Sequence, residues 1–312
     1  MDLNQTMWSR MKHWKGMRNI LIIFVVFLLT AGLGGYLYIH RIMNQTNQVD
    51  VDKNNLAASD NHDSIINIAL FGIDSASGEG RSDAIMIVTL DKNRGKVKLT
   101  SIMRDSYVAI DGHGMDKINH AYAFGGPELA IKTLNQNFGL NITDFASVDF
   151  DSMPKIIDQL GGVEITLTQE EVNTGSISGV TVAGSQTLNG EQALAYSRIR
   201  YATGNDYTRT ERQRTVLMAL ASKVVKQPIT SYPQLLSQLA SYTTTSLSAD
   251  AIINLATVYG NDAKHGIQEE RFPLDADAQG QMIDGVYYLV YDLPTEKQKI
   301  DDFIYYDQMP SS

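Results

Sequence analysis

Carboxylates stand at the ends of apolar, strand-like runs of this sequence. Asp74 follows the run IINIALFGI, and Asp83 precedes AIMIVTL, with a Gly- and Ser-rich loop between the two acidic residues. Loops beside strand ends are where α/β sheets build their sites. Two carboxylates that meet there can hold Mg²⁺, which keeps several waters and is usually completed by phosphate oxygens. Asp74 and Asp83 are therefore candidate ligands of Mg²⁺, with Mn²⁺ as the alternative ion.

Arginines are concentrated in one short stretch of the chain. Five of the 12 arginines lie within residues 198–214, RIRYATGNDYTRTERQR. The planar guanidinium grips phosphate or carboxylate oxygens with two parallel hydrogen bonds, so this cluster favours an anionic ligand. Arg198 and Arg200 would project to one face if their segment is extended. A solvated face paired with Asp206 and Glu211 explains the stretch equally well when it is taken alone.

Two further segments add charged and polar side chains of the same kind. Arg104 and Asp105 come directly after the strand-like run KVKLTSI, and DKINHAYAFGG carries Lys117, Asn119 and His120. A lone histidine such as His120 is more often a satisfied structural residue than a base. These segments place more cations and carboxylates beside predicted strand ends.

Taken together, the charged groups suit a phosphate attached to an apolar molecule, because apolar strands and helices flank them. A plain ion pair between Arg81 and Asp83, at the mouth of one strand, is the structural alternative for those two residues. The sequence has no Walker A motif, no H-E-x-x-H and no G-x-S-x-G. The sequence therefore lacks the usual motifs of P-loop nucleotide-binding proteins, zinc proteases and serine hydrolases.

The elements that must position these groups alternate between strand and helix patterns. Strand-like runs cover residues 65–73, 84–90, 96–102, 145–150 and 163–167, and helices are predicted near 127–138 and 152–160. This alternation predicts an α/β or α+β domain with a central sheet.

A longer helix is predicted from Thr208, which has capping-box spacing with Glu211 and precedes an apolar stripe. Arg209, Arg212 and Gln213 lie on the same side as that stripe, so the first turns of this helix are expected to form the rim of a pocket.

A membrane anchor is predicted near the start of the chain. Residues 20–39 include no charged residue, and this length is enough for a helix to cross a bilayer. Four basic residues and one acidic residue precede this run. The excess of positive charge predicts that the N-terminus stays in the cytoplasm and that the rest of the chain lies outside. A cleaved signal peptide would have a shorter apolar region of about 7–15 residues. The predicted organisation is a cytoplasmic tail (1–19), a transmembrane helix (20–40), a flexible tether (41–63) and an extracytoplasmic domain (64–312).

Composition excludes several classes of protein. Five of the 26 basic and one of the 35 acidic residues precede residue 42, so the exported part has net charge −13, which argues against a nucleic-acid surface. An apolar content of 43% excludes disorder over the whole chain. The absence of cysteine excludes disulfides, thiol catalysis and cysteine-ligated metals.

Seven stretches between about residues 64 and 225 carry a resemblance to a known family. In order they are NIALFGID, GRSDAIMIV, SIMRDSYV, KINHAYAFGGPELAIKTLNQNFGL, VDFDSMPKIIDQLGGVEI, LNGEQALAYSRIR and GNDYTRTERQR. With these stretches the chain resembles the LytR-CpsA-Psr family of Gram-positive cell-envelope proteins. Met103 and Ser106 stand where the family more often has Pro and Thr, and Ala84 stands in place of Thr; these departures bear on the shape of the groove or on lipid preference.

The resemblance implies an extracytoplasmic α/β/α domain, in which helices flank a central mixed sheet, anchored in the cell membrane by one transmembrane helix. It implies a phosphotransferase that binds a polyprenyl diphosphate in a hydrophobic groove. The enzyme would move a glycopolymer, such as teichoic acid or capsule, from that carrier to a peptidoglycan sugar hydroxyl with the help of Mg²⁺. The implied partners are the lipid-linked glycan, peptidoglycan and the membrane, with no nucleic acid.

The resemblance also assigns roles residue by residue. It makes Asp74 and Asp83 the metal ligands, and it gives catalytic roles to Asp83, Arg104, Arg198 and Arg200. The residues that it places around the diphosphate are Arg81, Arg104, Lys117, Arg198, Arg200, Asp206, Arg209 and Gln213. Arg212 and Arg214 have a structural alternative.

Some alternatives stay open at the level of sequence. The same residues would serve a polyprenyl-diphosphate hydrolase with water as acceptor, or a lipid-linked polymer binder without turnover. An envelope-linked transcriptional regulator would need a cytoplasmic DNA-binding part, but the short tail before residue 20 has no helix-turn-helix. Asp83, Asp105 and Asp206 are candidates for the group that accepts the hydroxyl proton, although a loose transition state needs little help from a base.

Overall fold

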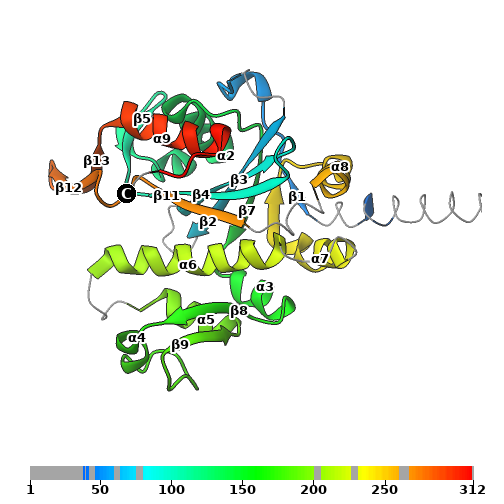
Figure 1. Cartoon of the computed structure of the whole chain (residues 1–312), viewed down its shortest axis with the longest axis vertical. Helices are drawn as coiled ribbons and strands as arrows, with labels where there is room; N and C mark the ends of the chain where they lie inside the picture. Colours follow the sequence, from blue (N-terminus) through cyan, green and yellow to red (C-terminus); the bar gives the residue numbers. More distant parts are fainter. Residues whose placement is uncertain are drawn as a thin grey trace, which may run out of the picture.

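The computed structural model describes residues 38, 40–41, 46–59, 64–74, 80–199, 205–225, 231–259 and 267–310. Its centre is a seven-stranded mixed sheet (Figure 1). In spatial order the strands are β1 (Asn47–Gln48), β10 (Thr243–Thr245), β7 (Asp144–Asp149), β2 (Ile65–Asp74), β3 (Arg81–Asp91), β4 (Lys96–Ile102) and β11 (Ile267–Phe272). β2, β3 and β4 form an antiparallel meander, whereas β7 runs parallel to β2 and β11 runs parallel to β4. The predicted mixed central sheet is confirmed.

Helices cover both faces of this sheet (Figure 1). α2 (His120–Phe138) and α9 (Leu293–Tyr306) lie on one face, and α6 (Asn205–Val225) lies along the other. α3 (Met153–Gln159) and α5 (Gly190–Ser197) lie beyond α6, on its side away from the sheet. Ile85 and Ile87 of β3 belong to the core under α2 and α9, whereas Ala84 and Met86 belong to the core under α3, α5 and α6. Because successive side chains of a strand point to opposite faces, a strand buried on both sides has the uninterrupted apolar run seen in β3.

Smaller elements surround the central sheet and its helices. Three two-stranded antiparallel sheets are formed by β5 (Tyr107–Ile110) with β6 (Gly114–Lys117), β8 (Val163–Leu167) with β9 (Gly184–Leu188), and β12 (Ala278–Ile283) with β13 (Val286–Tyr291). The described part of the chain also contains the helices η1 (Lys53–Asn55), α4 (Gln169–Asn173), α7 (Tyr232–Leu239), η4 (Ala240–Tyr242) and α8 (Ala249–Tyr259). The strand predicted at 163–167 is β8, which pairs with β9 and does not belong to the central sheet.

Two predicted helices are longer at their start than expected. α2 has a first turn before Gly125 and Gly126, where the backbone leaves the helical region, with φ 63° and ψ −157° at Gly126. Gly126 suits this position because a side chain would strain that conformation. Pro127 then opens the straight part, which agrees with the predicted helix at 127–138. α6 begins at Asn205, one turn before the predicted start at Thr208.

Residues 46–59 contact the folded domain, although the sequence predicted a flexible tether over 41–63. β1 pairs with β10, Lys53 Nζ lies 2.8 Å from Asp144 Oδ2, and Leu56 is fully buried in the core under α2. Asn135 of α2 also donates to the carbonyl oxygen of Leu56 over 2.8 Å. Val49 and Val51 also pack against this core. These contacts were not predictable from the sequence, because the few apolar residues of the segment follow no sustained helix or strand period.

Among the described residues, no helix is long and apolar enough to cross a membrane. The predicted cytoplasmic tail lies outside the described residues, as does the predicted span at 20–40 apart from Tyr38 and His40.

Gly72 gives a test of how β2 packs against α6. A Cβ atom at Gly72 would lie 2.4 Å from Leu217 Cδ1 and 3.3 Å from the Ala84 Cβ atom. We expect Gly72→Ala to lower the free energy of unfolding by about 1–3 kcal/mol through overpacking. Leu217→Ala alone should lower the free energy of unfolding by about 2–5 kcal/mol, because it leaves a cavity. The double variant should lose clearly less stability than the sum of the two single losses, because Leu217→Ala removes the atom with which the new Cβ atom would collide. Urea unfolding measures all three free energies, and additive losses would contradict this packing.

Candidate functional site

The end of β3 carries a β-bulge at Asp83. The register pairs Gly72 with Ala84 but Ile73 with Ser82, so Asp83 has no partner on β2. A bulge interrupts the alternation of side chains along the strand, and bulges often re-aim a side chain beside a functional site. Asp83 is only 6% exposed, so its carboxylate requires polar partners.

Arg104 and Asn119 hold the buried carboxylate of Asp83. Arg104 Nη1 donates to Oδ2 over 2.6 Å, and Asn119 Nδ2 donates to Oδ1 over 3.1 Å. Arg104 follows β4 and Asn119 directly precedes α2, so this carboxylate joins three elements. The sequence suggested Arg81 as the ion-pair partner of Asp83, but the structure places Arg104 there.

Asp105 extends this network to a second cation. Arg104 Nε lies 3.4 Å from Asp105 Oδ2, and Lys117 Nζ lies 2.8 Å from Asp105 Oδ1. The Lys117 ammonium also lies 6.0 Å from the ring centroid of Tyr287 in β13, which is the distance of a cation–π contact. Burial and the Asp105 carboxylate raise the pKa of Tyr287, so its hydroxyl stays protonated at neutral pH. We call Asp83, Arg104, Asp105 and Lys117 the charge network.

The charge network holds two cations that still reach the surface. The side chains of Arg104 and Lys117 are 18% and 16% exposed. A guanidinium has five N–H donors, and Arg104 uses only some of them on carboxylates. Its buried Nε atom lies 3.4 Å from Asp105 Oδ2, but the two atoms are not aligned for a hydrogen bond. The network is therefore suited to bind the oxygens of an anion.

Gln213 of α6 reaches the same end of the sheet from the other face. It lies one turn before Leu217, which packs on Gly72 near the end of β2. Within the described part of the chain, the Gln213 Oε1 and Ser82 Oγ atoms are both buried without a hydrogen-bond partner. Buried polar atoms are normally paired, so these two atoms mark a place where a polar ligand or water would be favourable.

The arginines of residues 198–214 separate into different environments. Arg198 is the C-cap of α5, its side chain is 61% exposed, and its Nη2 atom lies 3.9 Å from Asp151 Oδ1. Such an exposed pair contributes little, so the guanidinium remains available to a ligand. Arg212 is buried, and it donates to Glu171 Oε1 over 2.8 Å and to the Ile199 carbonyl oxygen over 3.2 Å. Arg212 is therefore a structural residue.

The other predicted site residues are placed only in part. Asp74 and Arg81 are opposite each other in the register of β2 and β3, at the bulged end. Arg200 lies outside the described residues. Asp206 and Arg209 belong to the first turns of α6, but their side chains are outside what the structure describes.

His120 is held at the start of α2 by Asp116. Its Nδ1 atom lies 2.8 Å from Asp116 Oδ2, and the Tyr288 hydroxyl donates to Asp116 Oδ1 over 3.4 Å. Burial raises the pKa of Asp116, but hydrogen bonds from His120, the Lys117 backbone amide and Tyr288 outweigh it, so the pKa lies below its ordinary value. These contacts make His120 a satisfied histidine.

The carboxylates fit a cation that takes part of its coordination from a ligand. No three His, Cys, Asp or Glu residues of the described chain are grouped so that they could share a metal ion. Asp74 and Asp83 supply two hard oxygen donors at adjoining strand ends. Mg²⁺ is commonly held by one or two carboxylates together with waters and substrate phosphates, so this donor set suits Mg²⁺ better than an all-protein cage.

The C-terminal hairpin of β12 and β13 contacts the charge network, which the sequence did not predict. Tyr287 in β13 contacts Lys117, and the Leu289 amide donates to the Asp105 carbonyl oxygen over 2.8 Å. Strand β13 is far from the charged motifs in sequence, and its aromatic run carries no signal of a site. Asn119 was visible as a polar residue in DKINHAYAFGG, but nothing in its type indicated a contact with Asp83.

The two arginine environments lead to a direct test. Arg212→Met should lower the free energy of unfolding by about 3–5 kcal/mol, because Glu171 would lose its buried partner. Arg198→Ala should change it by no more than about 0.5 kcal/mol, because that side chain is mostly exposed. Urea unfolding monitored by circular dichroism measures both. Equal losses in the two variants would show that the assignment of Arg212 as structural and Arg198 as available is incorrect.

Comparison with known proteins identifies the same family as the sequence motifs. A family model described as the LytR_cpsA_psr family matches residues 36–302. The chain is 32% identical over 282 residues to a protein of Enterococcus faecalis named polyisoprenyl-teichoic acid–peptidoglycan teichoic acid transferase TagU, covering 86% of this chain and 88% of that one. It is 33% identical over 247 residues to regulatory protein MsrR of Staphylococcus aureus, covering 78% and 75%.

Solved structures of TagT, a Bacillus subtilis protein, have the same fold. The structure described as TagT bound to LIIa-WTA has a TM-score of 0.62 at 27% identity, covering 78% of this chain and 92% of that one. A second, described with bound octaprenyl pyrophosphate lipid, has a TM-score of 0.58 at 26% identity, with the same coverage of 78% and 92%.

Proposed function

The chain belongs to the LytR-CpsA-Psr family, and from this membership we propose that it is a glycopolymer phosphotransferase. It would move a glycopolymer, of the teichoic acid type or a related polysaccharide such as capsule, from a polyprenyl diphosphate carrier to a peptidoglycan sugar hydroxyl. The observation that carries the proposal is the charge network, in which Arg104 contacts Asp83 and Asp105, and Lys117 contacts Asp105. The names of TagU and of the lipid-bound TagT structure support the same substrate class.

The diphosphate would bind where the strand ends, α6 and α5 converge. Arg104 and Lys117 supply positive charge that is already oriented by Asp83 and Asp105, so little reorganisation is needed when an anion binds. Arg198 adds an exposed guanidinium, and the Gln213 side chain would donate to the diphosphate through its amide N–H groups. We assign Arg81, Arg200, Asp206 and Arg209 to the same ligand by their motifs.

Asp74 and Asp83 would hold Mg²⁺ or Mn²⁺ in this proposal. The ion would neutralise phosphate oxygens as negative charge accumulates in the transition state. Support comes from the type of the donor atoms and from their position at adjoining ends of β2 and β3. Each Asp83 oxygen already accepts one hydrogen bond and retains a second lone pair for another contact.

Transfer then needs mainly positioning and charge stabilisation. The acceptor oxygen forms a bond to the phosphorus that carries the glycan, while the bond from that phosphorus to the bridging oxygen breaks. The leaving group is polyprenyl phosphate, and the hydroxyl proton passes to solvent or a nearby base. Arg104 and Lys117 would stabilise the charge that develops on the phosphate oxygens, and their carboxylate partners keep both cations in place.

We also propose that the domain acts outside the cell, with residues 20–40 as an uncleaved membrane anchor and a cytoplasmic N-terminus. The support is the uncharged run of 20 residues at 20–39 and the basic residues that precede it. A lipid carrier in the same membrane would then be within reach of the domain.

Activity in a purified system tests the proposal. Full-length protein in detergent, mixed with lipid-linked glycan, peptidoglycan and Mg²⁺, should produce a covalent wall conjugate, and EDTA should abolish it. Arg104→Ala or Arg198→Ala should lower the rate roughly 10²-fold or more, because each removes a stabiliser of developing charge. Lys92→Ala, which removes an exposed positive charge in the turn between β3 and β4, is the matched control and should keep the rate.

Each alternative outcome has a distinct meaning. Free polymer without wall conjugate would indicate a hydrolase that uses water as acceptor. Retained binding of the lipid without any metal-dependent turnover would indicate a polymer-binding protein. Full activity of Arg104→Ala would show that the charge network does not bind the diphosphate.

A further inference from the structure

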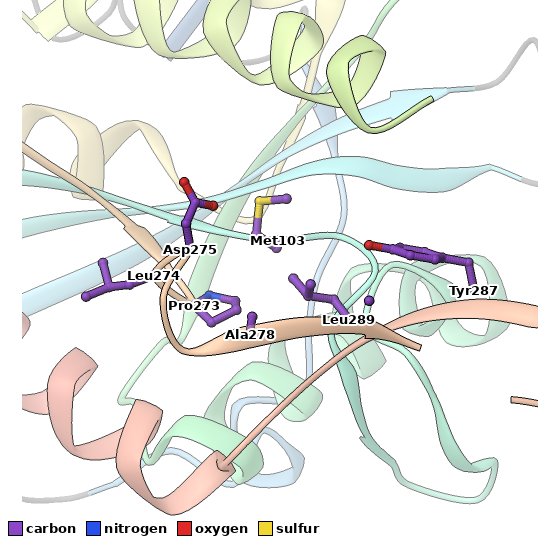
Figure 2. A pocket seen from close by; sticks show the side chains of 8 residues that line it. Met103, Pro273, Leu274, Asp275, Ala278, Tyr287 and Leu289 are labelled. Atoms are coloured by element: carbon purple, nitrogen blue, oxygen red, sulfur yellow. The ribbon is translucent and has the colours of Figure 1, made fainter. Parts of the chain in front are cut away.

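A hollow of about 270 Å³ lies next to the charge network, between the C-terminal hairpin and the loop that follows β11 (Figure 2). Pro273, Leu274, Ala278 and Leu289 give it an apolar lining, and Met103 adds a thioether. Met103 directly precedes Arg104 of the network. The remaining lining residues are Asp275, Gly280 and Tyr287.

Tyr287 connects this hollow to the charge network. Figure 2 shows its ring at one end of the hollow, with Leu274 and Asp275 at the opposite end. The ring is 38% exposed, and its centroid lies 6.0 Å from the Lys117 ammonium. A molecule that lies against this ring is therefore adjacent to a cation that we assign to the diphosphate.

Gly280 determines where the Tyr287 ring can lie. A Cβ atom at Gly280 would be 2.6 Å from Cε2 and 2.7 Å from the hydroxyl oxygen of Tyr287. These atoms are at the far end of a flexible side chain, so an alanine at position 280 would displace the ring while leaving the hairpin backbone in place. Gly280 thus allows the ring to lie across the hairpin and form one wall of the hollow.

The opposite end of the hollow is polar. Arg271 of β11 forms an ion pair with Asp275, and its Nη1 atom lies 4.0 Å from the Met103 sulfur. The Asp275 side chain is 79% exposed, so its oxygens can accept hydrogen bonds from a ligand while the pair is maintained. The hollow therefore has an aromatic end, an apolar floor and a charged end with both donors and acceptors.

We propose that this hollow is a monosaccharide subsite, which binds the sugar ring that neighbours the reacting phosphate. A sugar ring presents C–H groups on its faces, which pack on an aromatic ring, and hydroxyls on its edge, which pair with groups such as Asp275 and Arg271. The volume lies just below the range of about 300–1,000 Å³ for drug-sized ligands, so it suits one ring and is too small for a polyprenyl chain. This inference rests on the proposed function and adds where the sugar binds.

The subsite also gives Met103 a role. Met103 stands where the resembling family more often has Pro, and its side chain is part of the hollow. A flexible thioether adapts to irregular shapes, so this position adjusts the hollow to a particular sugar.

Binding of small probes tests the subsite. Full-length protein in detergent is titrated with N-acetylglucosamine 1-phosphate and, separately, with inorganic phosphate, and the dissociation constants are measured by ligand-observed NMR. Wild type should bind the sugar phosphate more tightly than phosphate. Tyr287→Ala and Gly280→Ala should each weaken sugar phosphate binding about 3–10-fold, as expected for loss of one stacking contact, and should leave phosphate binding within about twofold.

Matched controls separate this effect from a loss of structure. Tyr306→Ala removes another exposed tyrosine, at the end of α9 and outside the hollow, and should leave both constants unchanged. Gly280→Ala keeps the tyrosine, so it reports on ring position even if Tyr287→Ala disturbs the hairpin. Unchanged sugar phosphate binding in Gly280→Ala and Tyr287→Ala would overturn the proposal.

Transfer kinetics identify the source of the sugar. A raised KM for the lipid-linked glycan in Gly280→Ala would assign the subsite to the donor, and a raised KM for peptidoglycan would assign it to the acceptor. If wild type transfers no glycan but the sugar phosphate result holds, the proposed function fails and the subsite stands. If wild type transfers glycan and the variants keep both KM values and wild-type sugar binding, the subsite fails and the proposed function stands.

Discussion

The ion pair between Arg104 and Asp83 is the contact on which the arrangement of the site depends. It joins the bulged end of β3 to the segment after β4 over 2.6 Å, and Asn119 adds the start of α2. Asp83 is buried, and a buried charge is strongly unfavourable unless it is paired and hydrogen-bonded. The position of Arg104 is therefore determined by the fold before any ligand binds, and Asp105 and Lys117 take their places around it.

This constraint explains why cations and carboxylates alternate at one end of the sheet. Arg104 and Lys117 would repel each other if they were brought together alone, but Asp105 lies between them and contacts both. An anion that enters binds to cations whose side chains are already ordered, which lowers the cost of organising the site. The hairpin of β12 and β13 completes the site, because Tyr287 lies next to Lys117 and also forms a wall of the adjoining hollow.

Much of the fold could be predicted from apolar patterns, but the exact position of the charged side chains could not. The runs at 65–73, 84–90 and 96–102 correspond to β2, β3 and β4, because strands buried on both faces have long apolar segments. The bulge was not predictable, since it depends on how β2 and β3 pair and leaves no mark in the composition of RSDAIMIV. Arg212 and Arg198 are alike in sequence, and only the fold buries the first beside Glu171 and leaves the second exposed.

The most direct test of the central claim is a crystal structure of the protein with a short polyprenyl diphosphate and Mn²⁺. Anomalous scattering would locate the metal independently of the protein atoms. We expect one Mn²⁺ peak between the carboxylates of Asp74 and Asp83, with diphosphate oxygens in contact with Arg104 and Lys117. A metal and diphosphate bound elsewhere, with the Asp83–Arg104 pair and its surroundings empty of ligand, would contradict it.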